Sequence, residues 1–117
     1  MADLRLKLLL DAIQAIELAI VFVDGQSLDA YSSDQKTRSA VERQLEVLGE
    51  AFARLSREAP DLSQRLPAAG FAVGLRNRII HGYDSVDDAI VHATVTSDLP
   101  GLLAALQAWL KDRKSVV

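Results

Sequence analysis

Apolar residues recur along this chain at the three- and four-residue spacing that marks one face of an α-helix. The first such stripe predicts a helix from Asp3, a suitable N-cap, to about Val23, with Asp24-Gly25 as its end. The positions that this stripe should bury are Leu4, Leu8, Ala12, Ala15, Ile16, Ala19, Ile20 and Val23. A polar loop is expected to follow through Ser33.

A second helix has the most regular apolar spacing in the chain. Ser32, Ser33 or Asp34 can cap it, and it should stop before Pro60 because proline disfavours a helical conformation in the preceding residue. Its apolar stripe consists of Thr37, Val41, Leu45, Leu48, Phe52 and Leu55. A short connection that contains a turn is expected over residues 61–67.

The remaining pattern predicts shorter helices. A third helix should run from Pro67 through Ile79, with Gly82 as its C-terminal stop. A fourth should start at a cap at position 84, 85 or 87 and reach about Val95. Residues 96–98 then offer a new cap for a final helix, with Pro100 in its first turn.

The final helix carries its own apolar stripe, which consists of Leu99, Leu102, Leu103, Leu106, Trp109 and Leu110. No segment alternates apolar and polar residues long enough to indicate a sheet. The pattern as a whole predicts an all-α fold, an antiparallel helical bundle of four to five helices. We expect residues 1–117 to form a single domain, which suits a chain of this length.

Composition narrows the class of protein. The chain has no cysteine, which excludes a disulfide framework, a thiolate nucleophile and a zinc–thiolate site. We expect no membrane span and a cytoplasmic location, since no continuous apolar run reaches the length of a bilayer. The net charge of −3 disfavours a protein that coats nucleic acid over its whole surface. This net charge does not exclude a local basic site. One small basic cluster consists of Lys36, Arg38 and Arg43.

The chemistry is concentrated in one stretch, Arg76-Asn77-Arg78-Ile79-Ile80-His81-Gly82-Tyr83. Arginine is a permanent cation that matches phosphate oxygens, and histidine suits proton transfer near neutral pH. The pair Arg76 and His81 therefore has what metal-free cleavage of a phosphodiester requires. Arg78 is interpreted as a solvated or partner-facing charge, and no metal site or cofactor is expected.

Five residues along a regular helix rotate by roughly 140°, so Arg76 and His81 would not share a helix face. They can meet through local unwinding near Gly82 or through a second copy of the chain. We prefer a two-fold dimer, which brings two His81 and two Arg76 side chains into one groove and so supplies both a base and an acid. A helix C-terminus near His81 would also favour its protonated form.

The arrangement resembles the Arg-x4-His-x-Tyr motif of HEPN domains, and specifically of the HepT-type toxin ribonucleases. The second helix reads Arg43-Gln44-Leu45-Glu46-Val47-Leu48-Gly49-Glu50-Ala51, similar to the Leu-Glu-x-x-Gly-Glu-Ala stretch of that family. The segment from residue 86 to residue 100 is similar to the family's closing region. The resemblance implies a HEPN-like bundle that dimerises through the side bearing the motif. It also implies a metal-independent endoribonuclease with Arg76 and His81 as the catalytic pair and Asn77 in support.

Proteins of this type are typically paired with an MNT-type nucleotidyltransferase antitoxin. The resemblance therefore implies an RNA substrate, a toxin–antitoxin role and AMPylation of Tyr83 by the antitoxin. A bulky anionic nucleotide two residues from His81 would block entry of a phosphate. The alternatives are a non-catalytic helical subunit that binds a nucleotidyltransferase, and a purely structural helical dimer.

Other chemically capable residues have simpler interpretations. His92 lies among apolar neighbours and is expected to be structural, and Trp109 is expected in the core. The row Glu42, Glu46 and Glu50 has helical spacing, but no Glu-x-x-His pattern accompanies it. We therefore interpret the row as a solvated or dimer-facing stripe, not a metal site.

Overall fold

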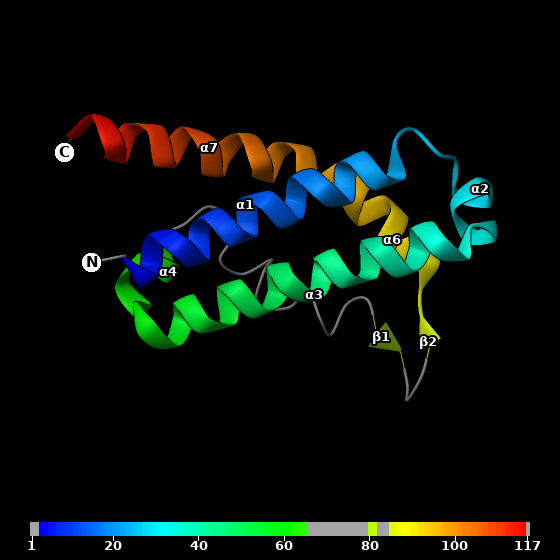
Figure 1. Cartoon of the computed structure of the whole chain (residues 1–117), viewed down its shortest axis with the longest axis horizontal. Coiled ribbons are helices and arrows are strands. Elements are labelled where there is room, and N and C mark those ends of the chain that lie inside the picture. The colour runs from blue at the N-terminus through cyan, green and yellow to red at the C-terminus, as the bar shows by residue number, and fades with distance from the viewer. Residues whose placement is uncertain (1–2, 66–79, 82–84, 117) are drawn as a thin grey trace.

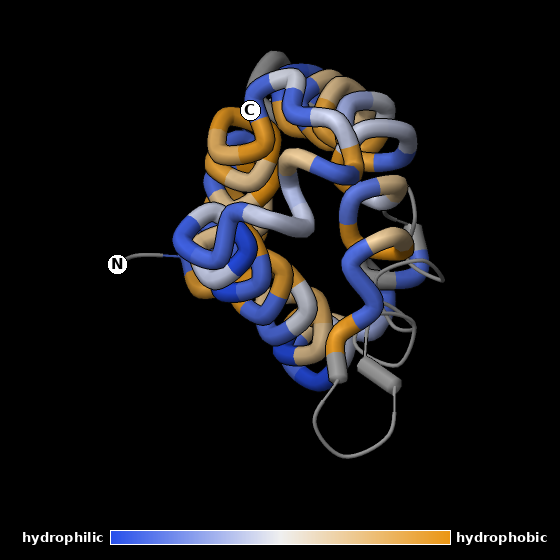
Figure 2. The backbone as a smooth tube through the Cα atoms, turned by 90° about the vertical axis from the view of Figure 1, so that its right-hand side faces the viewer, coloured by the Kyte–Doolittle hydropathy of each residue, from blue (hydrophilic) through white to orange (hydrophobic). Residues whose placement is uncertain are grey.

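The computed structural model of the chain describes residues 3–65, 80–81 and 85–116. Two long helices, α1 (Leu4–Val23) and α3 (Gln35–Glu58), run antiparallel at its centre. A third long helix, α7 (Leu99–Val116), lies along α1 (Figure 1). Figure 2 shows hydrophobic and hydrophilic positions around each helical tube, as amphipathic helices require. The predicted all-α bundle is confirmed.

Helix α1 begins and ends where the pattern predicts. The Asp3 side chain accepts a hydrogen bond from the backbone N–H of Arg5, and Asp24 closes the helix in the left-handed conformation, with φ of 38°. The buried face is broader than one stripe, because α1 lies between α3 and α7. Leu9 and Ile13 are buried although the predicted stripe omits them, whereas Leu4 is exposed.

Helix α3 also agrees with its prediction. Asp34 is the N-cap, and the helix ends at Glu58, two residues before Pro60. Asp34 accepts hydrogen bonds from the backbone N–H and the hydroxyl of Thr37, and its other partner is the side-chain amide of Gln26. The buried residues of α3 are Val41, Leu45, Leu48, Ala51, Phe52 and Leu55. The regular apolar spacing therefore identified the core face of this helix.

Two predicted connections are in fact short helices. Residues expected in a polar loop form α2 (Leu28–Ser33), capped by the Ser27 hydroxyl, which accepts the N–H of Ala30. Residues expected in a turn form α4 (Pro60–Arg65), where Pro60 takes the first helical position and has no N–H to leave unpaired. Single-turn helices show too little periodicity to be recognised, and α2 buries only Tyr31.

The predicted break at residues 96–98 is wrong. Helix α6 (Asp88–Ala93) begins at the predicted cap Asp87 and continues through a π-helical turn, η1 (Thr94–Asp98), directly into α7. The Leu99 N–H bonds to the Thr94 carbonyl five residues back. Pro100 follows this turn as the second residue of α7. A proline donates no backbone hydrogen bond, and its ring disfavours a regular helical turn before it.

Among the described residues, the run from Asp88 to Asp112 is long and apolar enough to cross a membrane by length and composition alone. By this criterion the expectation that no apolar run reaches this length is wrong. The same criterion is met by core helices of soluble proteins. In this chain the run buries Val91, Val95 and Leu99 against the bundle.

A short antiparallel ladder joins β1 (Ile80–His81) to β2 (Ser85–Val86), with Ile80 opposite Val86 and His81 opposite Ser85. Two-residue strands are too short to show alternation in the sequence. The ladder also corrects the predicted third helix, which cannot reach a stop at Gly82 because residues 80–81 are extended. The helix itself, predicted over residues 67–79, lies outside the described residues.

Candidate functional site

The predicted catalytic segment falls largely outside the described part of the chain. Arg76, Asn77, Arg78 and Tyr83 lie there, so the proposed meeting of Arg76 and His81 stays a prediction. The backbone of His81 is described and lies in β1. His81 is therefore in extended backbone and not in the last turn of a helix that stops at Gly82.

The ladder connects His81 to the main bundle on its C-terminal side. His81 pairs with Ser85 in β2, and only Asp87 separates β2 from the start of α6. The Asp87 carboxylate accepts the N–H of Ile90 at 3.1 Å and so caps α6. Val86 packs against the core. The backbone at His81 is thus paired with a strand that continues into a capped, packed helix.

A polar cluster lies where α2, α3 and α6 meet. Arg38 of α3 forms an ion pair with Asp88 in the first turn of α6, with Nη1 and Oδ2 3.5 Å apart. One turn along α3, burial raises the pKa of Glu42, and the negative charge of Asp88 raises it further. Burial likewise raises the pKa of the fully buried Tyr31 well above its usual value, and the negative charges of Glu42 and Asp88 raise it further. Two carboxylates thus lie near one guanidinium.

This cluster changes the interpretation of the basic residues predicted near the start of α3. Arg38 is paired with Asp88, and the exposed Arg43 is paired with Glu46 at 3.4 Å. Two of the three cations are therefore compensated by acids. The sequence allowed a local anion-binding patch here, but these compensated cations do not form one.

The structural interpretation of His92 is confirmed. Its Nε2 lies 2.7 Å from the carbonyl oxygen of Gln26, and since a carbonyl only accepts, the ring nitrogen donates. The His92 ring also lies beside the Tyr31 ring, with centroids 5.8 Å apart. These contacts fix the end of α6 against the connection that follows α1. Trp109 is partly buried and packs against the core, as expected.

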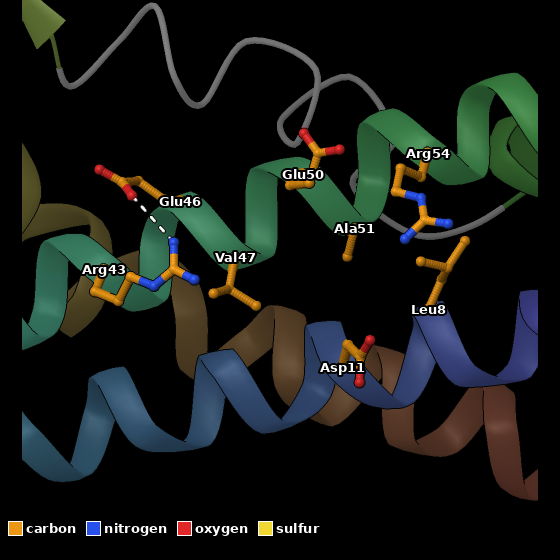
Figure 3. Close-up of a pocket in the computed structure, with 8 residues that line it drawn as sticks. All are labelled: Leu8, Asp11, Arg43, Glu46, Val47, Glu50, Ala51 and Arg54. Atoms are coloured by element: carbon orange, nitrogen blue, oxygen red, sulfur yellow. Dashed lines mark hydrogen bonds and ion pairs between the residues drawn. The ribbon is translucent and has the colours of Figure 1, made fainter.

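A shallow groove of about 150 Å³ lies between α1 and α3 (Figure 3). The described residues that line it are Leu8, Asp11, Arg43, Glu46, Val47, Glu50, Ala51 and Arg54. Leu8, Val47 and Ala51 make its apolar part, and the two arginines are accompanied by three carboxylates. Such mixed charge does not favour a polyanion over other ligands.

The glutamate row agrees with the interpretation as a largely solvated stripe. Glu46 is paired with Arg43, and Glu50 with Arg57 at 3.7 Å, and all four of these side chains are mostly exposed. Among the residues that the structure describes, no group of three or more His, Asp or Glu side chains could hold a metal ion. Glu42 differs from the other two because it faces the Arg38–Asp88 pair.

The described geometry does not identify the family of this chain, but its similarity to known proteins does. The family described as Ribonuclease HepT-like matches residues 12–109, a span that contains the whole segment 76–83. The chain is 34% identical over 92 residues to a protein of Thermococcus cleftensis named as a ribonuclease HepT, covering 79% of this chain and 83% of that protein. It is 30% identical over 104 residues to a protein of Methanocaldococcus jannaschii named as an RNase, covering 89% and 85%. No solved structure matches the chain.

Proposed function

Because this chain belongs to the ribonuclease HepT-like family, and is thereby an endoribonuclease, we propose that it cleaves RNA by internal attack of a 2′-hydroxyl and needs no metal ion. The observation that carries the proposal is the family match, whose span of residues 12–109 includes the Arg76 to Tyr83 motif. The residue types of that motif supply the chemistry without a further cofactor.

In the proposed reaction His81 removes the proton of the 2′-hydroxyl, and the 2′-oxygen forms a bond to the neighbouring phosphorus. The bond from phosphorus to the 5′-oxygen then breaks, and the leaving oxygen takes a proton from an acid. The guanidinium of Arg76 stabilises the negative charge that develops on the phosphoryl oxygens, and Asn77 supports it by hydrogen bonding. The products are a 2′,3′-cyclic phosphate and a 5′-hydroxyl.

The acid is best supplied by a second copy of the chain. The motif contains one histidine, and the other histidine of the chain, His92, is committed to the Gln26 carbonyl. A homodimer with a two-fold axis beside the motif provides two His81 rings for one scissile phosphate, one as base and one as acid. We therefore propose that the active site is a composite of two protomers.

We further propose that the enzyme is the toxin of a toxin–antitoxin pair in the cytoplasm. Its partner would be an MNT-type nucleotidyltransferase that transfers AMP from ATP to Tyr83. The phenol oxygen would attack the α-phosphorus, and pyrophosphate would leave. The added phosphate carries negative charge beside His81 and would repel the RNA backbone.

The test uses purified protein treated with EDTA and a labelled RNA. We expect cleavage that EDTA does not reduce, cyclic phosphate ends, and no cleavage of an RNA with a 2′-deoxy sugar at the cut site. Arg76→Ala and His81→Ala should each lower the rate at least a hundredfold. The exposed Arg57→Ala is the matched control and should leave it unchanged. Cleavage that survives His81→Ala, or that requires added Mg²⁺, contradicts the mechanism.

The composite site has its own test. Heterodimers that combine one wild-type protomer with one His81→Ala protomer should be as inactive as the His81→Ala homodimer, because one scissile phosphate needs both His81 rings. Half of the wild-type activity in these heterodimers would contradict the composite site. Light scattering on the same samples should give the mass of a dimer. A stable complex with a nucleotidyltransferase, without cleavage by the free protein, would favour the non-catalytic binding subunit.

A further inference from the structure

The position of His81 depends on how β2 is held. β2 contacts β1 directly, and Asp87 alone separates it from α6. Within the described residues, a shift of the first turn of α6 therefore moves β2, and β2 moves the backbone of His81. The contacts that fix the first turn of α6 can therefore affect the proposed RNA cleavage through the position of His81.

One side chain from the central helices reaches that turn. Arg38 of α3 is fifty residues from Asp88 in sequence, and their ion pair joins α3 to the start of α6. The two side chains are only 32% and 25% exposed, so solvent screens the pair less than a surface pair. Asp88 also lies at the N-terminal end of α6, where a negative charge is favourable.

The surroundings of the pair limit where Arg38 can go. Its Nε is buried and has no hydrogen-bond partner among the described residues, so the guanidinium is enclosed on that side. Tyr31 of α2 is fully buried close by, and Glu42 is the next acid along α3. At its other end, α6 is fixed by the hydrogen bond from His92 to the Gln26 carbonyl. Helix α6 is thus held at both ends by polar contacts to the rest of the bundle.

We infer that Arg38 is a positioning residue for the proposed reaction, acting through Asp88, the start of α6 and the β1–β2 ladder to hold His81 in place. The inference rests on the proposed function for its catalytic consequence. Its structural part, that the pair stabilises the ladder, does not depend on catalysis. Arg38 does not itself need to contact RNA.

The experiment measures the ladder and the reaction separately. Amide hydrogen exchange is followed at residues 80–81 and 85–86 of the ladder and at the centres of α1 and α3. The proteins compared are wild type, Arg38→Ala, Asp88→Asn and the charge-reversed double variant Arg38→Asp/Asp88→Arg. We expect exchange in the ladder to become about tenfold faster in the single variants, with α1 and α3 unchanged, because local opening needs less energy. The double variant should recover part of the protection, because it restores the ion pair but places a cation at the N-terminal end of α6.

RNA cleavage by the same proteins gives the second measurement. We expect kcat to fall about tenfold in each single variant with KM nearly unchanged, because misplaced catalytic groups impair the chemical step more than binding. Arg57→Ala, which removes an exposed pair on the same helix, is the control that should alter neither measurement. Arg38→Lys keeps the charge, so it should fall between wild type and Arg38→Ala.

The outcomes separate the two proposals. Unchanged exchange in the ladder of Arg38→Ala overturns the positioning role, whatever the activity. Faster exchange with an unchanged kcat also overturns it, since the ladder would then not govern the reaction. If the wild type does not cleave RNA, the proposed function fails, and the exchange data alone decide whether Arg38 holds the ladder.

Discussion

Adjacent leucines in α1 offer a strict test of the fold. Leu9 and Leu10 are the same residue type at adjacent positions of one helix, yet Leu9 is 1% exposed and Leu10 is 42% exposed. We expect Leu9→Ala to destabilise the protein strongly and Leu10→Ala only weakly. The change in helix propensity is the same at both positions, so it cancels in the comparison.

The magnitudes follow from burial. Leu9 is enclosed between helices, so alanine loses the transfer energy of the removed carbons and leaves a cavity, together about 3 kcal/mol. Leu10 already contacts water over much of its surface and leaves no enclosed cavity, so about 1 kcal/mol or less is expected. The difference of about 2 kcal/mol exceeds the error of a denaturation experiment.

Urea unfolding followed by circular dichroism, at two protein concentrations, measures both variants. Leu9→Ala should lower the transition midpoint far more than Leu10→Ala, without changing the slope. Equal losses would refute the orientation of α1. A larger loss for Leu10→Ala that depends on protein concentration would show instead that a second chain covers this face of α1.

Three further outcomes concern caps and charges. Ser27→Ala should destabilise by about 1 kcal/mol, measured by urea unfolding, because it removes the cap of α2. Hydrogen bonds from Thr37 lower the pKa of Asp34 in the folded state, so wild type should exceed Asp34→Ala in stability at pH 7 and lose that advantage as the pH falls through the folded pKa. Burial, and secondarily Asp88, raises the pKa of Glu42, so its charged form opposes folding. Glu42→Gln should therefore raise the melting temperature slightly at pH 7, and the gain should vanish at pH values where Glu42 is protonated.

The helices with strong periodicity could be predicted from sequence because their signals are local. Asp3 and Asp34 are good caps, Pro60 bars continuation of α3, and the four- and three-residue steps identify its core face. The motif Arg76 to Tyr83 was likewise recognisable, because its residue types and spacing resemble those of a known family. The family match agrees with it, while the roles of the individual residues stay predictions.

Other features could not be predicted, either because a local signal had two readings or because they depend on distant contacts. The continuous run through η1 contains Thr96 and Asp98, which looked like a new cap, yet the Thr96 hydroxyl bonds back to the His92 carbonyl. Helix α2 has only six residues, and the side chain that joins it to the core is its own Tyr31. The extended backbone at His81 arises from pairing with β2, which no local pattern indicated.

The sequence by itself determined the long helices α1 and α3, the caps at which they begin, and a short motif whose residue types suit phosphodiester cleavage. These properties follow from capping, backbone sterics and side-chain chemistry, all of which act over a few residues. The tertiary structure alone decided which of two neighbouring leucines is buried, which acid neutralises Arg38 and what holds the strand of His81. Those outcomes depend on which surfaces meet when distant helices pack, and burial and ion pairing exist only after they have met.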